Sequence, residues 1–272
     1  MVIVTTSYNN MKWIEKNINS ILFQQYRNYR VIYINDASQD GTGNEVERLI
    51  KKARLDYQVI DFDDYQSDDI EKTTRCFAEA VNHESHFFTL VNNVNRCGGL
   101  CNHYRAIHSC LDNEVIVSLD ADDWFSNKNV LRRLNAVYQA PDVWFTHGSL
   151  IEHPSGSTNW CEPIPSEIIE RNEYRKFKCP SHLKTFYAWI FKKIELQDLL
   201  WNGKFFPMTW DMAMMYPICE MAGERHAFIK EINYVYNMEN SLNDNKVDPY
   251  LQNELDRFIR NKPAYSRLEI AD

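Results

Sequence analysis

The stretch Val115-Ile116-Val117-Ser118-Leu119-Asp120-Ala121-Asp122-Asp123-Trp124 decides the fold of this chain. A short apolar run that ends abruptly in carboxylates is typical of a buried strand whose C-terminal end opens onto a site. Crowded aspartates repel one another unless a cation lies among them, and oxygen ligands suit Mg²⁺ or Mn²⁺ rather than zinc or copper. Mg²⁺ usually shares its ligand shell with phosphates. The stretch therefore predicts a strand leading into a metal and phosphate site.

The same carboxylates have a simpler interpretation. A solvated acidic turn, with Asp123 or Ser126 as the N-terminal cap of the following helix, would have a similar sequence. This stretch alone leaves both interpretations open.

Length and composition indicate a folded α/β protein. The chain has 272 residues, of which 44% are hydrophobic and 13% aromatic, so it can bury a substantial core. We expect one domain over 1–272. The net charge of -8 argues against nucleic acid as the main partner, because an acidic surface repels a phosphate backbone.

Cysteine usage and the N-terminus predict a soluble cytoplasmic protein. The seven cysteines are an odd number, and only Cys97 and Cys101 lie close together, without partners at zinc-finger spacing. We interpret them as reduced thiols. The chain starts with an apolar strand rather than a basic segment and a long apolar segment, so we expect no signal peptide, and no run is long enough to span a membrane.

Apolar periodicity predicts strands that alternate with helices, which is typical of a parallel sheet. Strands are expected at 2–6, 29–34, 57–62, 87–91, 115–119, 143–151 and 226–236. Helices are expected at 14–22, 46–53, 70–81, 100–111, 129–138, 194–201, 212–221 and 250–260. Four prolines interrupt the sequence between residues 163 and 207, so we expect a less regular second half.

Polar residues follow several of the predicted strands. Thr6-Ser7-Tyr8, Asn35-Asp36 and Asp120 to Asp123 each stand where a strand ends. In an open parallel sheet the ligand occupies the crevice beyond these ends, so the three segments should converge on one site. Arg96, before the pair Gly98-Gly99, is suited to pairing with a phosphate, although an arginine near a turn is often only a surface charge.

These segments resemble the family 2 glycosyltransferases of the GT-A fold. Val4-Thr5-Thr6-Ser7-Tyr8-Asn9 resembles the first strand and nucleotide-binding loop of the family. Tyr33-Ile34-Asn35-Asp36-Ala37-Ser38-Gln39-Asp40-Gly41-Thr42 resembles its Val-Asp-Asp-Gly-Ser-Thr-Asp-Gly-Thr segment, and Asp120-Ala121-Asp122-Asp123 its Asp-x-Asp motif. The resemblance implies a Rossmann-like, mostly parallel central sheet flanked by helices. It implies a nucleotide-sugar half at about 1–123, a less regular acceptor-side half at about 124–248 and a helical tail at about 249–272.

The resemblance is weaker in three places. Asn35 replaces the first aspartate of the family's pair, which leaves Asp36 to hold the uracil or ribose. Residues 57–85 look like an insertion without an assigned role. The segment Asn95 to Asn102 matches the family's Asn-x-Gly loop only loosely.

Three later segments extend the resemblance. Ser181-His182-Leu183-Lys184-Thr185-Phe186 resembles a His-Leu-Arg-Thr-Phe segment of some members, and Tyr234 to Asp244 resembles a late segment of the same subgroup. Thr209-Trp210-Asp211-Met212 stands where the family carries the catalytic base. Core packing of Trp210 and a structural role for His182 are the simpler alternatives.

The family implies a metal-dependent, inverting, hexosyltransferase-type enzyme. A sugar would pass from a nucleotide diphosphate donor, with a UDP-sugar favoured, to a hydroxyl of a glycan, a lipid-linked glycan or a protein. Asp122, with Asp123 nearby, would bind Mn²⁺ or Mg²⁺. Asp120 would face the donor ribose or sugar, Thr6, Tyr8 and Asp36 the nucleotide, and Arg96 the diphosphate. Asp211 would be the base, with a pKa raised by burial, Trp210 supplying an apolar wall, or with its efficiency resting on position alone.

Two other functions fit parts of the sequence. A sugar nucleotidyltransferase also uses a parallel sheet, Mg²⁺ and aspartates, but it carries a Gly-rich N-terminal loop, and residues 5–13 contain no glycine. A non-catalytic nucleotide-sugar or glycan binder of the same fold is the other alternative, which the Asn35 change keeps open.

Overall fold

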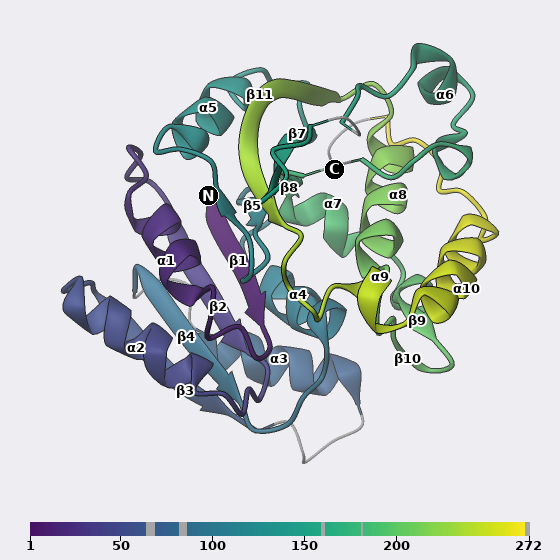
Figure 1. The fold of residues 1–272 in the computed structure, drawn as a ribbon. Helices are drawn as coiled ribbons and strands as arrows, with labels where there is room; N and C mark the ends of the chain where they lie inside the picture. The colour runs from purple at the N-terminus through teal and green to yellow at the C-terminus, as the bar shows by residue number, and fades with distance from the viewer. Residues whose placement is uncertain (64–68, 82–85, 159–160, 181, 270–272) are drawn as a thin grey trace.

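The structure is a computed structural model that describes residues 1–63, 69–81, 86–158, 161–180 and 182–269. Over these residues the chain forms a large mixed sheet with helices on both faces (Figure 1). The sheet strands are β1 (Val2–Ser7), β2 (Arg30–Asn35), β3 (Tyr57–Phe62), β4 (Phe88–Asn93), β5 (Val115–Ser118), β6 (Trp124–Phe125), β7 (Phe145–His153), β8 (Thr185–Tyr187) and β11 (His226–Asn237). The short strands β9 (Leu200–Trp201) and β10 (Lys204–Phe205) pair separately.

The helices separate the strands as the sequence periodicity predicts for most of the chain. The α-helices are α1 (Ile14–Leu22), α2 (Thr42–Lys52), α3 (Ile70–Val81), α4 (Gly99–His108), α5 (Val130–Val137), α6 (Ser166–Glu170), α7 (Ala188–Lys192), α8 (Trp210–Ala222), α9 (Asp244–Val247) and α10 (Pro249–Arg260). Two 3₁₀ turns, η1 (Tyr174–Lys176) and η2 (Leu196–Leu199), lie in the second half.

The sheet order is β3-β4-β2-β1-β5-β8-β7-β11-β6. Neighbours from β3 to β5 are parallel, as are β7 and β11, whereas β8 and β6 run antiparallel to their neighbours. The prediction of a mostly parallel sheet is confirmed. Because parallel strands end at the same edge, the polar ends of β1, β2, β4 and β5 lie side by side.

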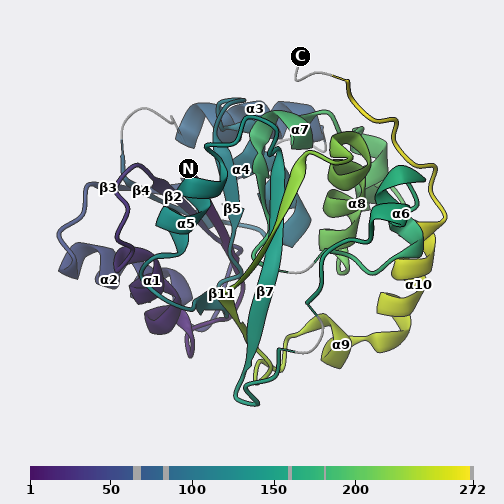
Figure 2. The same ribbon diagram turned by 90° about the horizontal axis from the view of Figure 1, so that it is seen from above.

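Alternating side chains of the strands pack into two cores, one on each face of the sheet. Val2 and Val4 belong to the core covered by α3, α4, α7 and α8, whereas Ile3 belongs to the core covered by α1, α2 and α5. Figure 2 shows these helical layers from above. Strands that are apolar on both sides need such covering, which explains their near-continuous hydrophobic runs.

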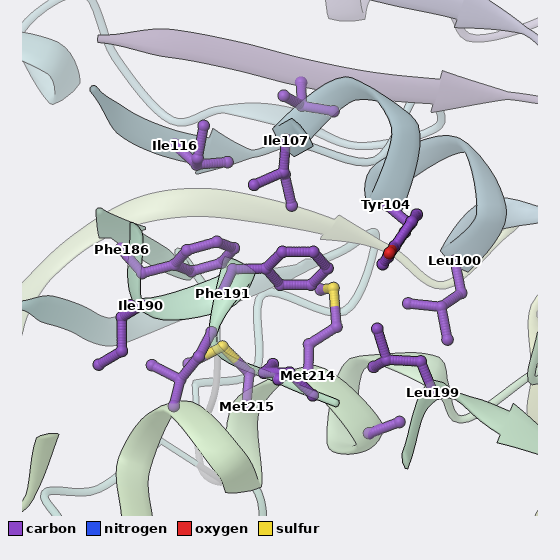
Figure 3. Close-up of a cluster of buried hydrophobic side chains, with 14 of the residues drawn as sticks. Leu100, Tyr104, Ile107, Ile116, Phe186, Ile190, Phe191, Leu199, Met214 and Met215 are labelled. Atoms are coloured by element: carbon purple, nitrogen blue, oxygen red, sulfur yellow. The ribbon is translucent and has the colours of Figure 1, made fainter. Parts of the chain in front are cut away.

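The core beside α8 is formed mainly by aliphatic, aromatic and methionine side chains. Figure 3 shows Tyr104 and Ile107 of α4, Phe191 of α7 and Met214 of α8 converging there. Almost every residue of α8 after Asp211 is buried. The N-terminus of α8 is therefore held by a rigid core, which fixes Asp211 in space.

The structure differs from the sequence analysis in three places: one predicted helix is wrong, one alternative interpretation is excluded, and two short elements were not predicted. The helix predicted at 194–201 is the 3₁₀ turn η2 followed by strand β9. Neither Asp123 nor Ser126 caps a helix, because α5 begins at Val130 after Asn129 and β6 follows the aspartates directly. The strand β8 and helix α7 were not predicted, since each is too short to show a periodic pattern.

The described part of 57–85 forms a strand of the sheet and a helix that covers it. Strand β3 pairs with β4 at the sheet edge, and Phe77 and Val81 of α3 are buried against the core. The rest of the predicted acidic loop at 64–68, and residues 82–85, lie outside the described residues.

One buried histidine predicts acid sensitivity of the fold. His147 of β7 is fully buried against the rings of Phe145, His226 and Phe228, and neither ring nitrogen has a hydrogen-bond partner within the described part of the chain. Burial, and to a lesser extent the charge of His226, lower the pKa of His147 to about 3. The unfolded chain therefore binds more protons between that value and the ordinary histidine pKa of about 6.5.

Above about pH 6.5, His147 is neutral in both the folded and the unfolded chain, so it causes no loss of stability. At about pH 5 only the unfolded chain is protonated there, and we expect the free energy of unfolding to be lower by about 2 kcal/mol. The variant His147→Phe should lose correspondingly less stability on acidification. Urea unfolding of both proteins at neutral and at acidic pH measures the difference. An identical pH dependence of the two proteins would show that His147 is not protonated on unfolding.

Candidate active site

A cavity of about 520 Å³ opens at the C-terminal ends of the parallel strands. Every residue predicted from the sequence as part of the site lines this cavity: Thr6, Tyr8, Asp36, Arg96, Asp120, Asp122, Asp123 and Asp211. The wall also contains residues from the loop after β11 and from the segment before β8. The predicted convergence of separate strand ends is thus present in the structure.

The turn Asp120 to Asp123 is held from two sides. Asn17 of α1 is fully buried and donates hydrogen bonds to the backbone oxygens of Asp120 (3.0 Å) and Asp123 (2.8 Å). On the other side, the Asn237 side chain donates to the Asp122 backbone oxygen at 3.1 Å. These hydrogen bonds are made to backbone oxygens of the turn. They therefore orient the side chains of Asp120, Asp122 and Asp123 without occupying a carboxylate oxygen.

The Asp123 carboxylate is a structural anchor. Tyr234 donates to Asp123 Oδ2 at 2.6 Å, and the Asn237 backbone N–H donates to Oδ1 at 2.7 Å. Burial and the charge of Asp122 raise the pKa of Asp123 well above its usual range. Because both oxygens accept hydrogen bonds from β11, Asp123 holds β11 against the turn.

Asp122 and Asp120 present different environments. Burial, followed by the charge of Asp120, raises the pKa of Asp122 to about 6, and Asn240 donates to Asp122 Oδ2 at 2.7 Å. Burial alone would raise the pKa of Asp120, but His182, 3.6 Å away, and the Lys184 charge lower it to about 2. Asp120 is thus ionised and oriented by cationic and polar neighbours.

Asp122 is suited to bind a divalent cation whose coordination shell also includes ligand atoms. Its oxygens are hard donors, and mutual repulsion among the aspartates is what a bound cation would relieve. No group of three His, Cys, Asp or Glu side chains arranged to hold a metal occurs among the described residues.

Asp36 organises the neighbouring loop. Asp36 Oδ1 accepts hydrogen bonds from the Asn93 side chain (2.9 Å) and the Cys97 N–H (3.0 Å), and Oδ2 accepts from the Gly98 N–H at 2.9 Å. With its side chain only 4% exposed, Asp36 has little surface left for a nucleotide. Asp36 lines the cavity and also shapes its wall by holding the loop at Cys97 and Gly98.

Asn35 has a packing role. It does not line the cavity, and its side-chain amide donates to Asn92 Oδ1 at 3.0 Å. A Cβ on Gly43 would lie 2.5 Å from the Asn35 Nδ2, so the glycine makes room for this pair. An aspartate at 35 would place a carboxylate against an acceptor oxygen, which explains the asparagine physically.

Tyr8 and Arg96 form one face of the cavity. The Arg96 guanidinium lies 3.7 Å from the centre of the Tyr8 ring, and its Nε lies 4.0 Å from Asp36 Oδ2. The Arg96 side chain is 60% exposed, so its charge faces the cavity and solvent. A stacked ring and guanidinium offer a flat surface for a base and a positive charge for a phosphate.

Asp211, at the start of α8, is paired with a buried lysine that the sequence prediction did not assign. Lys184 Nζ donates to Asp211 Oδ2 at 3.0 Å, and the lysine side chain is 4% exposed. Burial alone would raise the pKa of Asp211, but the charge of Lys184 and its hydrogen bond lower it below the usual range. Of the two alternatives for Asp211, a pKa raised by burial or an effect of position alone, the lowered pKa favours the second.

Trp210 lines the same cavity as Asp211 and also packs against α4. Its indole packs over His103, with ring centres 4.6 Å apart. A Cβ on Gly99 would lie 3.0 Å from the indole Nε1, so Gly99 permits this packing. Trp210 thus joins the first turn of α8 to α4.

The residue before Trp210 is held in an unusual conformation. Thr209 has a φ of 58°, which is rare for a β-branched residue, and its N–H donates to Asp244 Oδ2 at 2.9 Å. Burial raises the pKa of Asp244 to about 6. Asn240 and Asp244 had only a weak signal in the sequence, in the polar loop after β11.

Comparisons with known proteins agree with this geometry. Residues 2–60 match the family described as glycosyl transferase family 2. No curated protein sequence matches the chain.

Several solved structures share the fold. S. aureus TarS 1-349 in complex with UDP matches with a TM-score of 0.58 and 15% identity over 95% of this chain and 63% of that one. The complex of the same protein with UDP-GlcNAc gives 0.57 and 13% over 95% and 64%. The mannosyltransferase PcManGT from Pyrobaculum calidifontis, with GDP-Man and Mn²⁺, gives 0.51 and 17% over 87% and 55%. The chain spans less than two thirds of the length of each of these proteins.

Proposed function

We propose that this chain is a family 2 glycosyltransferase with a GT-A fold and that it transfers a sugar from a nucleotide diphosphate donor to an acceptor hydroxyl with inversion. One observation carries the proposal: the Asp120 to Asp123 turn and Asp211, far apart in sequence, line the same cavity. Family 2 membership of residues 2–60 and the nucleotide-sugar complexes of similar structures support it. A UDP-sugar is the favoured donor because of the UDP and UDP-GlcNAc complexes.

The donor would lie across the strand ends. The stacked Tyr8 and Arg96 would contact the nucleotide and its diphosphate, with Thr6 beside them. Asp120, held by His182, would accept hydrogen bonds from donor hydroxyls. Asp122 would hold Mn²⁺ or Mg²⁺, which supplies charge neutralisation to the leaving diphosphate when bound.

Asp211 would accept the proton of the attacking acceptor hydroxyl. Its Oδ2 is fixed by Lys184, and Oδ1 has no hydrogen-bond partner among the described residues. Because the pKa of Asp211 is lowered, the carboxylate is ionised at neutral pH but is a weak base. Asp211 would therefore contribute to catalysis through its placement next to the attacking hydroxyl rather than through a high affinity for protons.

A thermal-shift and hydrolysis screen tests the function. UDP-, GDP- and TDP-sugars are each added with Mn²⁺ to the wild type and to Asp122→Ala. At a donor concentration of about 100 times Kd, binding should stabilise the wild type by about 2.7 kcal/mol, because ligand binding favours the folded state. The shift should require metal, and it should be absent in the variant.

Nucleotide release distinguishes the alternatives. Slow release of the nucleoside diphosphate from one donor would support a transferase. Binding without release, with or without added glycans, would favour a non-catalytic binder. No response to any donor would contradict the assignment of the aspartate turn. Among the described residues no helix is long and apolar enough to cross a bilayer.

A further inference from the structure

A second cavity, of about 390 Å³, adjoins the first at Asp211. The two cavities share five lining residues: His182, Thr209, Asp211, Tyr236 and Gln252. The second cavity contains none of the residues assigned above to the donor, namely Tyr8, Arg96, Asp120 and Asp122. Asp211 therefore lies on the boundary between the donor cavity and a separate space.

The walls of this second cavity are polar and lack an unpaired cation. Apart from the shared residues, α10 contributes Asn253 and Asp256, and the remaining lining residues are Cys179, Pro180 and Met212. Neither lysine nor arginine is among the described lining residues. Side-chain amides and carboxylates recognise hydroxyl groups through hydrogen bonds, whereas an anion needs a cation to compensate its charge when it is buried.

The nearest cations are already neutralised. Lys184 pairs with Asp211 at 3.0 Å. Arg260 pairs with Asp256 at 2.5 Å and also donates to the backbone oxygens of Arg175 and Phe177. Neither side chain is available to compensate a phosphate or a carboxylate on a ligand, so the field in this cavity disfavours anions.

Aromatic side chains at the boundary suit a sugar ring. Tyr236 lines both cavities, and its ring lies 5.7 Å from that of His182 at an interplanar angle of 26°. Rings with one apolar face and one polar edge favour ligands that combine C–H faces with hydroxyl groups.

We propose that the second cavity is the acceptor subsite and that it takes an uncharged, polyhydroxylated acceptor, a neutral sugar or polyol. The inference rests on the proposed function of the first cavity. In the reaction the acceptor hydroxyl oxygen bonds to the anomeric carbon of the donor sugar as the bond from that carbon to the diphosphate oxygen breaks. The electron pair of the broken bond leaves with the nucleoside diphosphate, and the hydroxyl proton passes to Asp211.

A blocking variant tests the location. Asn253 is an exposed residue of α10 at the rim of the cavity, so Asn253→Trp places a large side chain over the cavity, whereas Glu254→Trp places the same side chain at the next exposed position, which does not line the cavity. With methyl glycosides of neutral sugars as acceptors, glycoside formation by Asn253→Trp should fall by about tenfold or more relative to donor hydrolysis in the same sample. Glu254→Trp should keep the wild-type ratio.

A charge series tests the acceptor class. For the wild type, neutral methyl glycosides should accelerate nucleotide release and yield glycoside product, whereas glucuronate and sugar phosphates should not. The variant Asp256→Asn removes one cavity carboxylate while keeping an acceptor oxygen for Arg260, and should improve the use of glucuronate by about threefold to tenfold.

The possible outcomes distinguish failure of the proposed acceptor subsite from failure of the proposed transferase function. If nucleotide is released but anionic acceptors work as well as neutral ones, or no neutral glycoside reacts, the acceptor class is wrong. If Asn253→Trp keeps the wild-type ratio, the location is wrong. If no donor is bound or hydrolysed, the proposed function itself fails and the subsite falls with it.

Discussion

Replacing Asp211 by Asn is expected to lower kcat for sugar transfer by about 10²- to 10⁴-fold while leaving donor affinity nearly unchanged, because a general base contributes about that factor. The amide cannot accept the hydroxyl proton, yet it retains an oxygen that can accept the Lys184 hydrogen bond. The residues assigned to the donor lie elsewhere in the cavity. Steady-state transfer kinetics and donor titration by calorimetry measure the two quantities.

Asp112→Asn is the matched control for this change. Asp112 is a largely exposed residue whose ion pair with Lys192 lies outside the cavity, so the variant should keep full activity. An equal loss of donor affinity and turnover in Asp211→Asn would place Asp211 on the donor instead. Unchanged turnover would mean that another group accepts the proton.

Replacing Glu220 by Gln is expected to destabilise the fold by about 3–5 kcal/mol, because it leaves a buried charge without its partner. Arg175 Nε and Nη2 donate to the two Glu220 oxygens at 2.6 and 2.9 Å, and the glutamate side chain is fully buried. The Tyr265 N–H donates to the same carboxylate at 3.0 Å. The ion pair therefore ties α8 to η1 and to the segment after α10.

The exposed ion pair between Lys176 and Glu173 provides the control. Glu173→Gln makes the same chemical change on the surface and should leave the stability close to that of the wild type, because exposed ion pairs are screened by water. Urea unfolding of the three proteins measures the difference. A small effect at Glu220 would mean that water or a rearranged side chain solvates Arg175 after the substitution.

The sequence determined the first half of the fold and the chemical character of the site. Strands such as Val2–Ser7 and Arg30–Asn35 are apolar on both faces and are followed by helices with one apolar stripe, so local patterns specify a covered parallel sheet. Polar residues at the strand ends then fall together as a consequence of topology. This is why motifs and their order were enough to predict residues that line one cavity, Asp211 included.

The short elements of the second half were not predictable. Thr185–Tyr187 and Ala188–Lys192 are too brief to carry a periodic signal, and they form only because β5, β7 and the α8 core surround them. The helix wrongly expected at 194–201 has helical spacing of apolar residues but ends in a strand paired with β10.

Only the tertiary structure decided the roles of individual carboxylates. Asp122 and Asp123 are adjacent in sequence, yet β11 occupies both oxygens of Asp123 and leaves Asp122 facing the cavity. Lys184 and Asp211 become partners, and the lysine lowers a pKa that burial alone would raise. A sequence specifies which charges are present, but their pKa values and partners depend on distance and burial, which arise only when segments distant along the chain pack together.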